Sequence, residues 1–454
     1  MQLDMTKGSP FRLIIKFIVP IIIGNIFQQL YSMVDTIIVG RYVGVQALAA
    51  VGATGTISFL ILGFSQGLTT GFTIITGQRF GAGDEEGIKK SVGSAITLTA
   101  IVIVVMTFGS ILVMDPLLTV MNTPDDIYEM SRTYIMIICY GIIGNLWYNL
   151  VASLLRAVGN SKVPLYFLVF SAFLNIFLDL LFVVNFRTGV GGAAWATVIS
   201  QLLAGALCHL YIWKKVPLLR PERRHYRLEA HLALIQLRIG IPMALQFCIT
   251  AIGTIILQSA LNLLGSTAVA SYTAACKVEQ LVTQPFGAMG VTMSTYGAQN
   301  LGTNDLSRIR KGVRVANLMS AVYSVIIYGV VIALMPYLIR LFVSENVEEV
   351  LYYADIYIKV CGLFFIPLGM IFIFRNVLQG CGYGFMPMMG GVVELASRGV
   401  LALMAAQRLS YVGVCLANAS AWCSAGIFLW IAYYPFMKKL SRVMNRSAVP
   451  EEGR

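Results

Sequence analysis

The side chains of this sequence that could do chemistry are a few ionisable groups inside long apolar segments. Asp35 lies in the stretch "YSMVDTIIVG", and Asp179 lies in "NIFLDLLFV". A charged side chain at the centre of a membrane helix costs roughly 2.5–3.5 kcal/mol on insertion scales, so it is expected to face a cavity or a partner. Asn175 precedes Asp179 by one helical turn and shares its face. These residues predict a polar site inside a membrane.

Tyr134 and Thr197 are expected at a similar depth. Asp35 and Asp179 each lie near the outer end of an outward-running segment, and Tyr134 and Thr197 lie near the outer end of inward-running segments. If they converge with Asn175, burial and a like-charged neighbour both favour a protonated carboxyl. We therefore predict a coupling-ion site that takes up a proton outside and releases it when a helix rearranges. The alternative is that Asp35 caps a partner or contacts headgroup water.

The second half of the chain carries a different set of intramembrane charges. Its segment 235–262 contains no acid. Glu394 and Arg398 are spaced i, i+4 and are able to pair, which favours a buried structural ion pair over a transport role. Lys277 and Glu279 are two positions apart and do not face each other, so one of them is a candidate to line a cavity.

The composition places these charges in a membrane protein. Of the 454 residues, 57% are hydrophobic and 12% are charged, whereas a soluble domain carries roughly 25% charged residues. The apolar runs are continuous, which argues against the alternating pattern of a β-barrel. A spanning helix needs about 20 apolar residues. The sequence therefore predicts an all-α polytopic membrane protein.

Twelve apolar segments are predicted to span the membrane. They are 13–40, 47–76, 91–113, 130–153, 163–184, 190–213, 235–262, 267–296, 314–341, 350–375, 386–406 and 410–436. Lys and Arg gather before the first segment, in every second loop and after the last segment. Because cytoplasmic loops carry an excess of Lys and Arg, both termini are predicted to face the cytoplasm. These loops account for the formal net charge of +12, which needs no nucleic-acid partner.

The chain is predicted to be an internal duplication. "GQRFGAGDEEGIKK" (Gly77–Lys90) matches "AQNLGTNDLSRIRK" (Ala298–Lys311), 221 positions later by subtraction. Repeats about half a chain apart indicate two copies of one unit. The predicted domains are an N-terminal lobe (1–213, six helices), a basic cytoplasmic linker (214–234) and a C-terminal lobe (235–454, six helices).

Six helices is an even number, so the two copies share one orientation in the membrane, with a site between them. This arrangement favours a transporter that works by alternating access over a structural or receptor-like bundle.

Other chemistry is sparse in the sequence. There is no Walker motif and no Ser/His/Asp arrangement, so neither an ATP-driven pump nor any other enzyme is predicted. The eight cysteines contain no CxxC pair, and the three histidines lie in or beside one basic loop, which does not predict a zinc site. No cofactor is expected. The only metal considered is Na⁺, at Asp35 and Asp179.

The segment "MVDTIIVGRYVGVQALAAVG" (Met33–Gly52) resembles the helix 1–2 signature of the multidrug and toxic compound extrusion (MATE) family. Further segments resemble the family in the same order: "GQRFGAGD", "LLRAVGNSKVP", "NIFLDLLFV" and "GVGGAAWATVISQ". The resemblance covers nearly the whole chain. It implies a two-lobed fold of twelve helices and export of cationic or amphipathic compounds against H⁺ or Na⁺.

The resemblance also assigns roles to single residues. Asp35 matches the family's helix 1 acid, and Asn175 and Asp179 match the Asn-xxx-Asp of the branch that resembles the DNA-damage-inducible F proteins. Tyr134 and Thr197 fall where that branch completes its pocket in the first lobe. Two departures are Leu180, where a proline often follows the helix 5 acid, and the missing helix 7 acid of the Na⁺-coupled branch.

The sequence as a whole predicts a multidrug efflux antiporter of the cell membrane that exchanges organic, cationic or amphipathic compounds for H⁺. Its partners are expected to be small organic cations and membrane lipids, and the protein is expected to be a monomer. Na⁺ coupling, a lipid-linked oligosaccharide flippase of the same superfamily and a non-transporting membrane scaffold are the alternatives.

Overall fold

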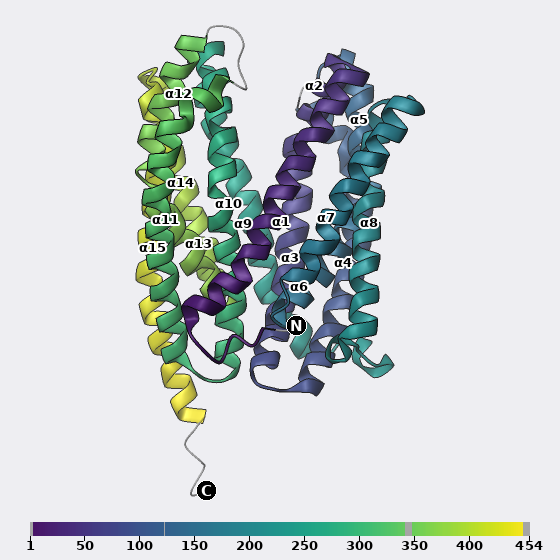
Figure 1. The fold of residues 1–454 in the computed structure, drawn as a ribbon, viewed down its shortest axis with the longest axis vertical. Coiled ribbons are helices and arrows are strands. Elements are labelled where there is room, and N and C mark those ends of the chain that lie inside the picture. The colour runs from purple at the N-terminus through teal and green to yellow at the C-terminus, as the bar shows by residue number, and fades with distance from the viewer. Residues whose placement is uncertain (1–2, 122, 341–346, 448–454) are drawn as a thin grey trace, which may run out of the picture. The chain divides into compact units, whose positions relative to one another are not determined.

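The structure is a computed structural model that describes residues 3–121, 123–340 and 347–447. Within these ranges the ordered elements are helices, and no strand occurs (Figure 1). The first half contains α1 (Pro10–Ile38), α2 (Val45–Ala53), α3 (Gly55–Gly81), α4 (Glu85–Val120), α5 (Asp125–Tyr140), α6 (Ile142–Ala157), α7 (Lys162–Asp179) and α8 (Gly189–Lys215). The second half contains α9 (Ala230–Asn262), α10 (Ser266–Gly302), α11 (Leu306–Arg340), α12 (Val347–Gly362), α13 (Phe365–Gly380), α14 (Phe385–Gln407) and α15 (Tyr411–Ser447).

Four short helical segments complete the described chain. Two are π-helical, η1 (Val39–Val43) and η2 (Leu180–Asn185), and two are 3-10 turns of the linker, η3 (Pro217–Leu219) and η4 (Arg223–Tyr226).

The helices agree with the predicted membrane spans. By length and composition, nine helices of the described residues can cross a membrane, or eleven if each of two bent pairs is one span. The pairs are α5 with α6, bent by 44°, and α12 with α13, bent by 50°. The 37-residue helix α10 is not among these helices. Counting it as a further span gives the predicted twelve.

One predicted segment, 47–76, is divided in the structure. Helix α2 ends at Ala53 and α3 begins at Gly55, with Thr54 between them. The Thr54 hydroxyl donates a hydrogen bond to the Val51 carbonyl at 2.9 Å. Glycine is a weak helix former, and a side chain that bonds to its own backbone competes with the helix. Apolar periodicity alone does not reveal this break.

The duplication is visible in matching helix starts. Asp84 caps α4 by accepting a hydrogen bond from the Gly87 backbone N–H at 2.8 Å. Asp305 caps α11 in the same way, from the Arg308 backbone N–H at 2.9 Å. Both the caps and the donors are 221 positions apart by subtraction. The same local structure therefore begins the same helix in each copy.

Backbone conformation repeats with this offset as well. Gly44 and Gly265 have φ values of 121° and 93°. Gly83 and Asn304, each one residue before a cap, have φ values of 70° and 58°. Asn is one of the few residues besides Gly that adopt the left-handed region readily. The turn is thus kept in the second copy although its glycine is not.

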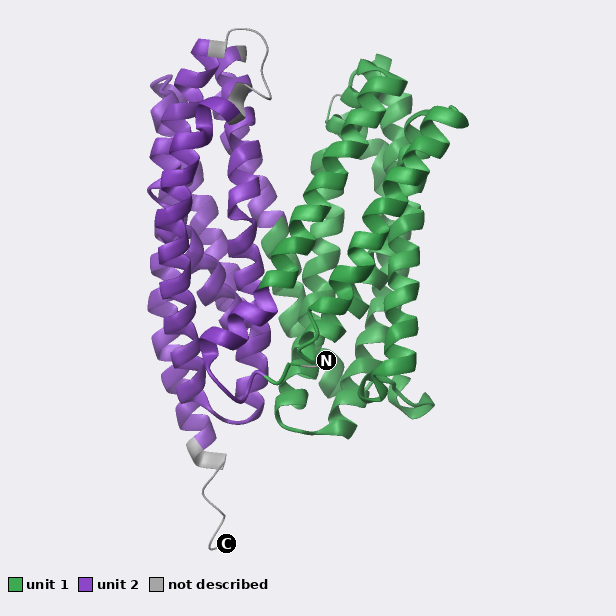
Figure 2. Ribbon diagram, in the orientation of Figure 1, with its two compact units in different colours: residues 1–4, 19–247 green, residues 5–18, 248–454 purple. Residues whose placement is uncertain are grey.

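The chain divides into two compact units (Figure 2). Unit 1 consists of Met1–Asp4 and Val19–Phe247, and unit 2 consists of Met5–Ile18 and Cys248–Arg454. The chain passes from one unit to the other between Asp4 and Met5, inside α1 and inside α9. The predicted lobe limits at 213 and 235 stay a prediction. In unit 1, a buried core of Phe72, Leu150 and Cys208 joins α3, α6 and α8.

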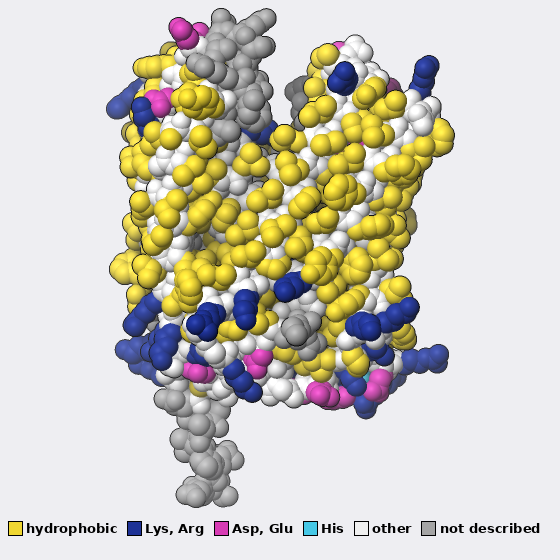
Figure 3. All heavy atoms as spheres, in the orientation of Figure 1, with side chains coloured by type: hydrophobic (Ala, Val, Ile, Leu, Met, Phe, Trp, Pro, Cys, Tyr) yellow, Lys and Arg dark blue, Asp and Glu magenta, His cyan; other side chains and the backbone are white. Residues whose placement is uncertain are grey.

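The surface of each unit is that of a membrane protein. Figure 3 shows hydrophobic side chains over the middle of the visible helices and Lys and Arg side chains near their ends. On α4, Phe108 and Leu112 are 65% and 77% exposed, and Leu318 on α11 is 67% exposed. Extensive exposed apolar surface of this kind suits hydrocarbon rather than water. The chain is therefore a polytopic membrane protein.

Candidate functional site

The five residues of the predicted coupling site lie on four helices of unit 1. Asp35 is on α1, Tyr134 on α5, Asn175 and Asp179 on α7, and Thr197 on α8. Asp179 and Asn175 are buried, and the other three are half-buried. Tyr134 interacts electrostatically with both acids. Asn175 Nδ2 donates a hydrogen bond to Thr197 Oγ1 at 3.4 Å. The structure therefore brings all five side chains together.

The two acids of this site are neighbours. The carboxyl groups of Asp35 and Asp179 are close enough to interact with each other electrostatically. Ionised carboxylates only accept hydrogen bonds, so a bond between these two requires a proton on one of them. Without that proton, Asp35 Oδ1 and both carboxyl oxygens of Asp179 are buried with no hydrogen-bond partner in the described structure.

Asn175 adds one more buried hydrogen-bond acceptor. Its Oδ1 atom has no hydrogen-bond partner among the described residues. A buried acceptor that lacks a donor costs about 1–3 kcal/mol, and more if it is charged. Several such oxygens close together suit a positive species, either a proton or a small cation.

Tyr31 is a member of this site that the sequence reasoning missed. It lies one turn before Asp35 on α1, and it interacts with Gln28, Gln201 and both acids. The signal that could have found it is the spacing, because residues four apart on a helix are neighbours. The Tyr31 phenol therefore connects the two acids with the side-chain amides of Gln28 and Gln201.

Local helix geometry distinguishes the positions of the two acids. The π-helical segment η1 begins one turn after Asp35, and η2 begins directly after Asp179. π-helical turns are rare in proteins as a whole, and those that occur are often found at functional sites. Val39 of η1 and Val183 of η2 are buried in one small apolar core, and Tyr134 packs against it. This core is an apolar wall beside the carboxyl pair.

Glu394 is the centre of a buried ion network in unit 2. One of its oxygens accepts a hydrogen bond from Arg398, on the same helix α14, at 2.8 Å, and the other accepts one from Arg375 of α13 at 3.1 Å. Arg398 also donates to Asn418 of α15 at 3.1 Å, and Asn418 donates to Tyr272 of α10 at 3.0 Å. The spacing of Glu394 and Arg398 thus does pair them, and the network connects four helices.

Glu279 and Lys277 are separated in the structure. Glu279 of α10 accepts a hydrogen bond from the Tyr357 hydroxyl of α12, which in turn accepts one from the Cys276 thiol at 3.3 Å. Lys277 is exposed, whereas Glu279 is half-buried. Glu279 is therefore the member of this pair that is built into the helix bundle, and its role in transport stays a prediction.

Metal-binding clusters are not found in the described part of the chain, where no three His, Cys, Asp or Glu side chains are grouped to hold an ion. All eight cysteines are free thiols. Na⁺ is a hard cation and prefers oxygen ligands. If the site held Na⁺, the side-chain oxygens of Asp35, Asn175 and Asp179 would bind it.

Comparison with known families identifies two repeats in the chain. The family model described as MatE matches residues 20–181 and again residues 242–403. The two matches begin 222 positions apart by subtraction, which is close to the offset of the sequence repeats. This result confirms the predicted internal duplication.

Similar proteins are found along nearly the full length. The chain is 28% identical over 451 residues to the "Probable multidrug resistance protein YoeA" of Bacillus subtilis, with 96% of each chain covered. It is 29% identical over 381 residues to the "Probable multidrug resistance protein YpnP" of the same organism, with 84% of each covered.

A solved structure titled "Outward-facing conformation of a multidrug resistance MATE family transporter of the MOP superfamily" shares the fold. Its TM-score is 0.91 at 21% identity, over 97% of this chain and 98% of that one.

Proposed function

Because this chain belongs to the MatE family, we propose that it is a secondary active antiporter that exports organic, cationic or amphipathic compounds in exchange for H⁺. Two similar proteins of Bacillus subtilis are named as probable multidrug resistance proteins, which favours efflux over flipping of a lipid-linked oligosaccharide. Alternating access of the two halves is the mode of transport expected for a duplicated helical protein.

The observation that carries this proposal is the pair of interacting carboxyl groups in unit 1. Asp35 and Asp179 can bond to each other only when they share a proton, and Asp35 Oδ1 and both carboxyl oxygens of Asp179 otherwise lack donors in the described structure. An imported proton satisfies this pair. A change in the surroundings of Asp35 on α1 then removes the partner and releases the proton. Asn175, Tyr134 and Thr197 supply the polar surroundings of the pair.

The distribution of basic residues gives the proposal its direction. Lys and Arg dominate the predicted cytoplasmic loops and both ends of the chain. We place both termini in the cytoplasm and the acids of unit 1 toward the outer surface, where protons enter. The site in a bacterial cell would therefore load from outside and drive export outward. The resemblance to the DNA-damage-inducible F branch agrees with H⁺ as the coupling ion, and Na⁺ is the alternative.

Ethidium accumulation in everted membrane vesicles tests this function. Vesicles with an acidic interior and the full-length protein should accumulate ethidium, and an outward Na⁺ gradient alone should not drive it. Asp35→Asn and Asp179→Asn should each reduce accumulation to that of vesicles without the protein, because an amide cannot take up and release a proton.

Asp126→Asn is the matched control, since Asp126 is an exposed acid in the first turn of α5. It should accumulate ethidium as the wild type does. Full activity of both site variants contradicts the coupling role of the acids. Accumulation driven by Na⁺ alone contradicts H⁺ coupling and leaves efflux itself in place.

A further inference from the structure

A cationic groove lies in unit 2, whereas the coupling site belongs to unit 1. It encloses about 760 Å³ between α11, α13 and α15. Arg310 and Arg314 of α11 and Lys438 of α15 line it. All three are exposed, and none of them forms an ion pair with an acid in the described ranges. The groove therefore presents three positive charges that the described structure does not neutralise.

The groove has a charged end and an apolar end. Lys438 follows Trp430 by eight positions on α15, which is about 12 Å along a helix axis. Arg310 and Arg314 lie in the first turns of α11, at the end that the charge distribution assigns to the cytoplasm. Ile366 and Met370 of α13 line the groove as apolar residues, two turns and one turn before Phe374, whose ring packs on Tyr433. A ligand that fits has an anionic head and an apolar tail.

Two buried hydroxyl groups of the groove also lack partners. Tyr433 and Ser320 line it and are 5% and 4% exposed. The Tyr433 hydroxyl and Ser320 Oγ have no hydrogen-bond partner in the described chain. Tyr433 interacts electrostatically with Arg310 and Arg314. A phosphate bound by the arginines can accept the hydrogen bond of the Tyr433 hydroxyl.

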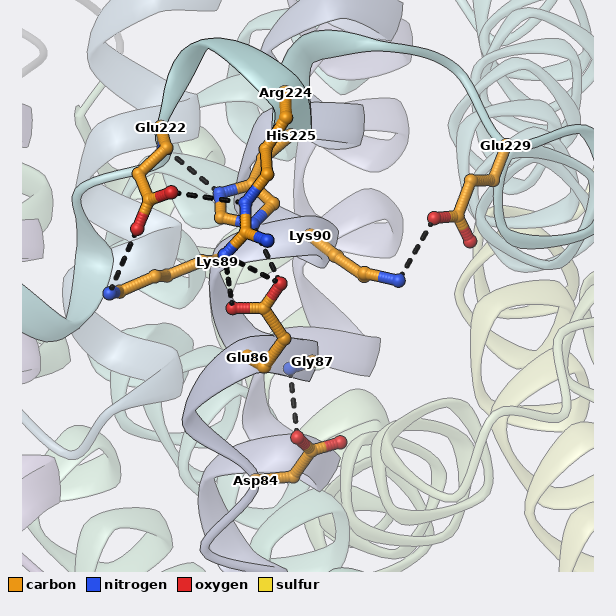
Figure 4. A network of polar contacts seen from close by, with 9 residues as sticks. All are labelled: Asp84, Glu86, Gly87, Lys89, Lys90, Glu222, Arg224, His225 and Glu229. Atoms are coloured by element: carbon orange, nitrogen blue, oxygen red, sulfur yellow. Dashed lines mark hydrogen bonds and ion pairs between the residues drawn. The ribbon is translucent and has the colours of Figure 1, made fainter.

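The corresponding groove of unit 1 is occupied by the linker. The turns η3 and η4 pack against α4, and η3 also packs against α8. Figure 4 shows the polar contacts of this segment. Glu222 pairs with Lys89 at 3.7 Å and Glu229 pairs with Lys90 at 3.1 Å. The buried ring of His225 contacts Glu86 at 2.9 Å.

Unit 2 carries basic residues at the positions that correspond to Lys89 and Lys90 of unit 1. Arg310 stands 221 positions after Lys89, and Lys311 stands 221 positions after Lys90, by subtraction. Helix α8 ends at Lys215 before the linker turns back, whereas α15 continues straight to Ser447. The N-terminal segment contacts α11 at Arg308, which donates hydrogen bonds to the Met5 and Gly8 carbonyls. In the described ranges Arg310 and Arg314 form no hydrogen bond or ion pair with any segment.

A single position shows that the two grooves accept different occupants. A Cβ atom on Gly93 would lie 2.2 Å from the His225 carbonyl oxygen, so the linker backbone needs glycine there. The residue 221 positions later is Arg314. An arginine blocks the close approach of a backbone and supplies charge instead.

We propose that the groove of unit 2 binds a phospholipid with an anionic headgroup from the cytoplasmic leaflet. The phosphate contacts Arg310, Arg314 and Lys438, and the acyl chain lies along Ile366 and Trp430. Basic pockets between membrane helices on the cytoplasmic side are known to bind such headgroups. The lipid takes the place that the linker carboxylates occupy in unit 1.

Native mass spectrometry of the delipidated full-length protein tests this proposal. We expect one phosphatidylglycerol to bind more tightly than phosphatidylcholine. A cation near a membrane surface contributes about a fivefold gain in affinity for an anionic lipid. The variant R310Q/R314Q/K438Q should therefore bind phosphatidylglycerol on the order of 100-fold more weakly. The matched control K214Q/K215Q/R223Q removes three exposed linker-side charges and should bind as the wild type does.

A second measurement uses the unaltered groove. Phosphatidylglycerol with brominated acyl chains should quench the fluorescence of Trp430 in nanodiscs, and Trp430→Phe should remove that component. Equal affinity for the two lipids, equal loss in the control variant, or quenching unchanged by Trp430→Phe would each overturn the proposal. So would a gain of lipid binding on removal of residues 448–454, because the tail would then be the occupant.

Discussion

At the scale of single residues, charge is unevenly balanced in the buried network of unit 2. Arg375 and Arg398 are 7% and 4% exposed and share the one carboxylate of Glu394. Arg375 Nε and Arg398 Nη1 are also buried without partners in the described structure. Because both cations form their ion pairs with this one carboxylate, Glu394 is the most sensitive member of the network.

Glu394→Gln should destabilise unit 2 by about 3–5 kcal/mol, since breaking a buried ion pair leaves an uncompensated charge. Glu229→Gln is the matched control, because Glu229 and Lys90 form an exposed pair at 3.1 Å outside the predicted spans. Solvent screens that pair, so its loss should leave the unfolding midpoint nearly unchanged. Thermal unfolding of both purified variants in detergent measures the difference. Equal midpoints for the two variants would contradict a structural role of Glu394.

The sequence predicted which residues would meet in unit 1 but not all of their partners. The acids of α1 and α7 stand out because a charge is rare in an apolar segment. Tyr31 and Gln201 do not stand out, since tyrosine and glutamine occur in many helices without a polar role. Arg375 lies near a helix end in the sequence, and only the packing of α13 against α14 shows its contact with Glu394.

At the scale of helices, the repeated caps fix where two long helices begin. The backbone N–H of Arg308 and the hydroxyl of Ser307 donate hydrogen bonds to Asp305 and lower its pKa. A carboxyl with a lowered pKa stabilises the fold above its unfolded pKa of about 3.9, and this contribution is lost as the pH falls through the lowered value.

Asp305→Ala should destabilise the protein by about 1 kcal/mol at neutral pH, the usual cost of a lost N-cap. Asp305→Asn keeps a good capping oxygen without the charge and should retain most of the stability. Unfolding midpoints at neutral and acidic pH separate the two variants, and the deficit of Asp305→Ala should shrink in acid. A deficit of equal size in Asp305→Asn would show that charge matters more than the cap.

Helix number and order could be predicted because each span needs a long apolar run. Helix ends and bends could not. The helices continue past their apolar parts, as α4 does from Glu85 to Val120 around the predicted 91–113. The bends between α5 and α6 and between α12 and α13 lie at corresponding places in the two copies. Apolar residues continue through both bends, so hydropathy carries no signal of them.

At the scale of the whole molecule, the linker is a packed part of unit 1. Leu219 and His225 are buried, and Thr97 of α4 donates a hydrogen bond to the Tyr226 carbonyl at 3.0 Å. The sequence predicted a basic linker from its composition. A basic composition by itself suggests an exposed loop rather than a packed one. The packing depends on Gly93, whose role is visible only when the two segments are in contact.

Gly93→Leu should displace the linker, because the new side chain would occupy the place of the His225 carbonyl. Trypsin added to everted vesicles should then cut at Arg223, Arg224 or Arg227 several times faster than in the wild type. Gly109→Leu, on the same helix, is the control, since a Cβ there meets no atom within 4 Å. Equal cleavage rates in wild type and Gly93→Leu would contradict the packed linker.

The packing of the linker against unit 1 has a practical consequence for labelling this protein. The longest polar loop of a transporter is the usual choice for inserting a fluorescent reporter or an affinity tag. In this protein, an insertion between Val216 and Tyr226 would displace the buried side chains of Leu219 and His225 from their packing in unit 1. Arg227 and Leu228 are exposed and lie between η4 and α9. A reporter placed between those two residues leaves the buried contacts on either side intact.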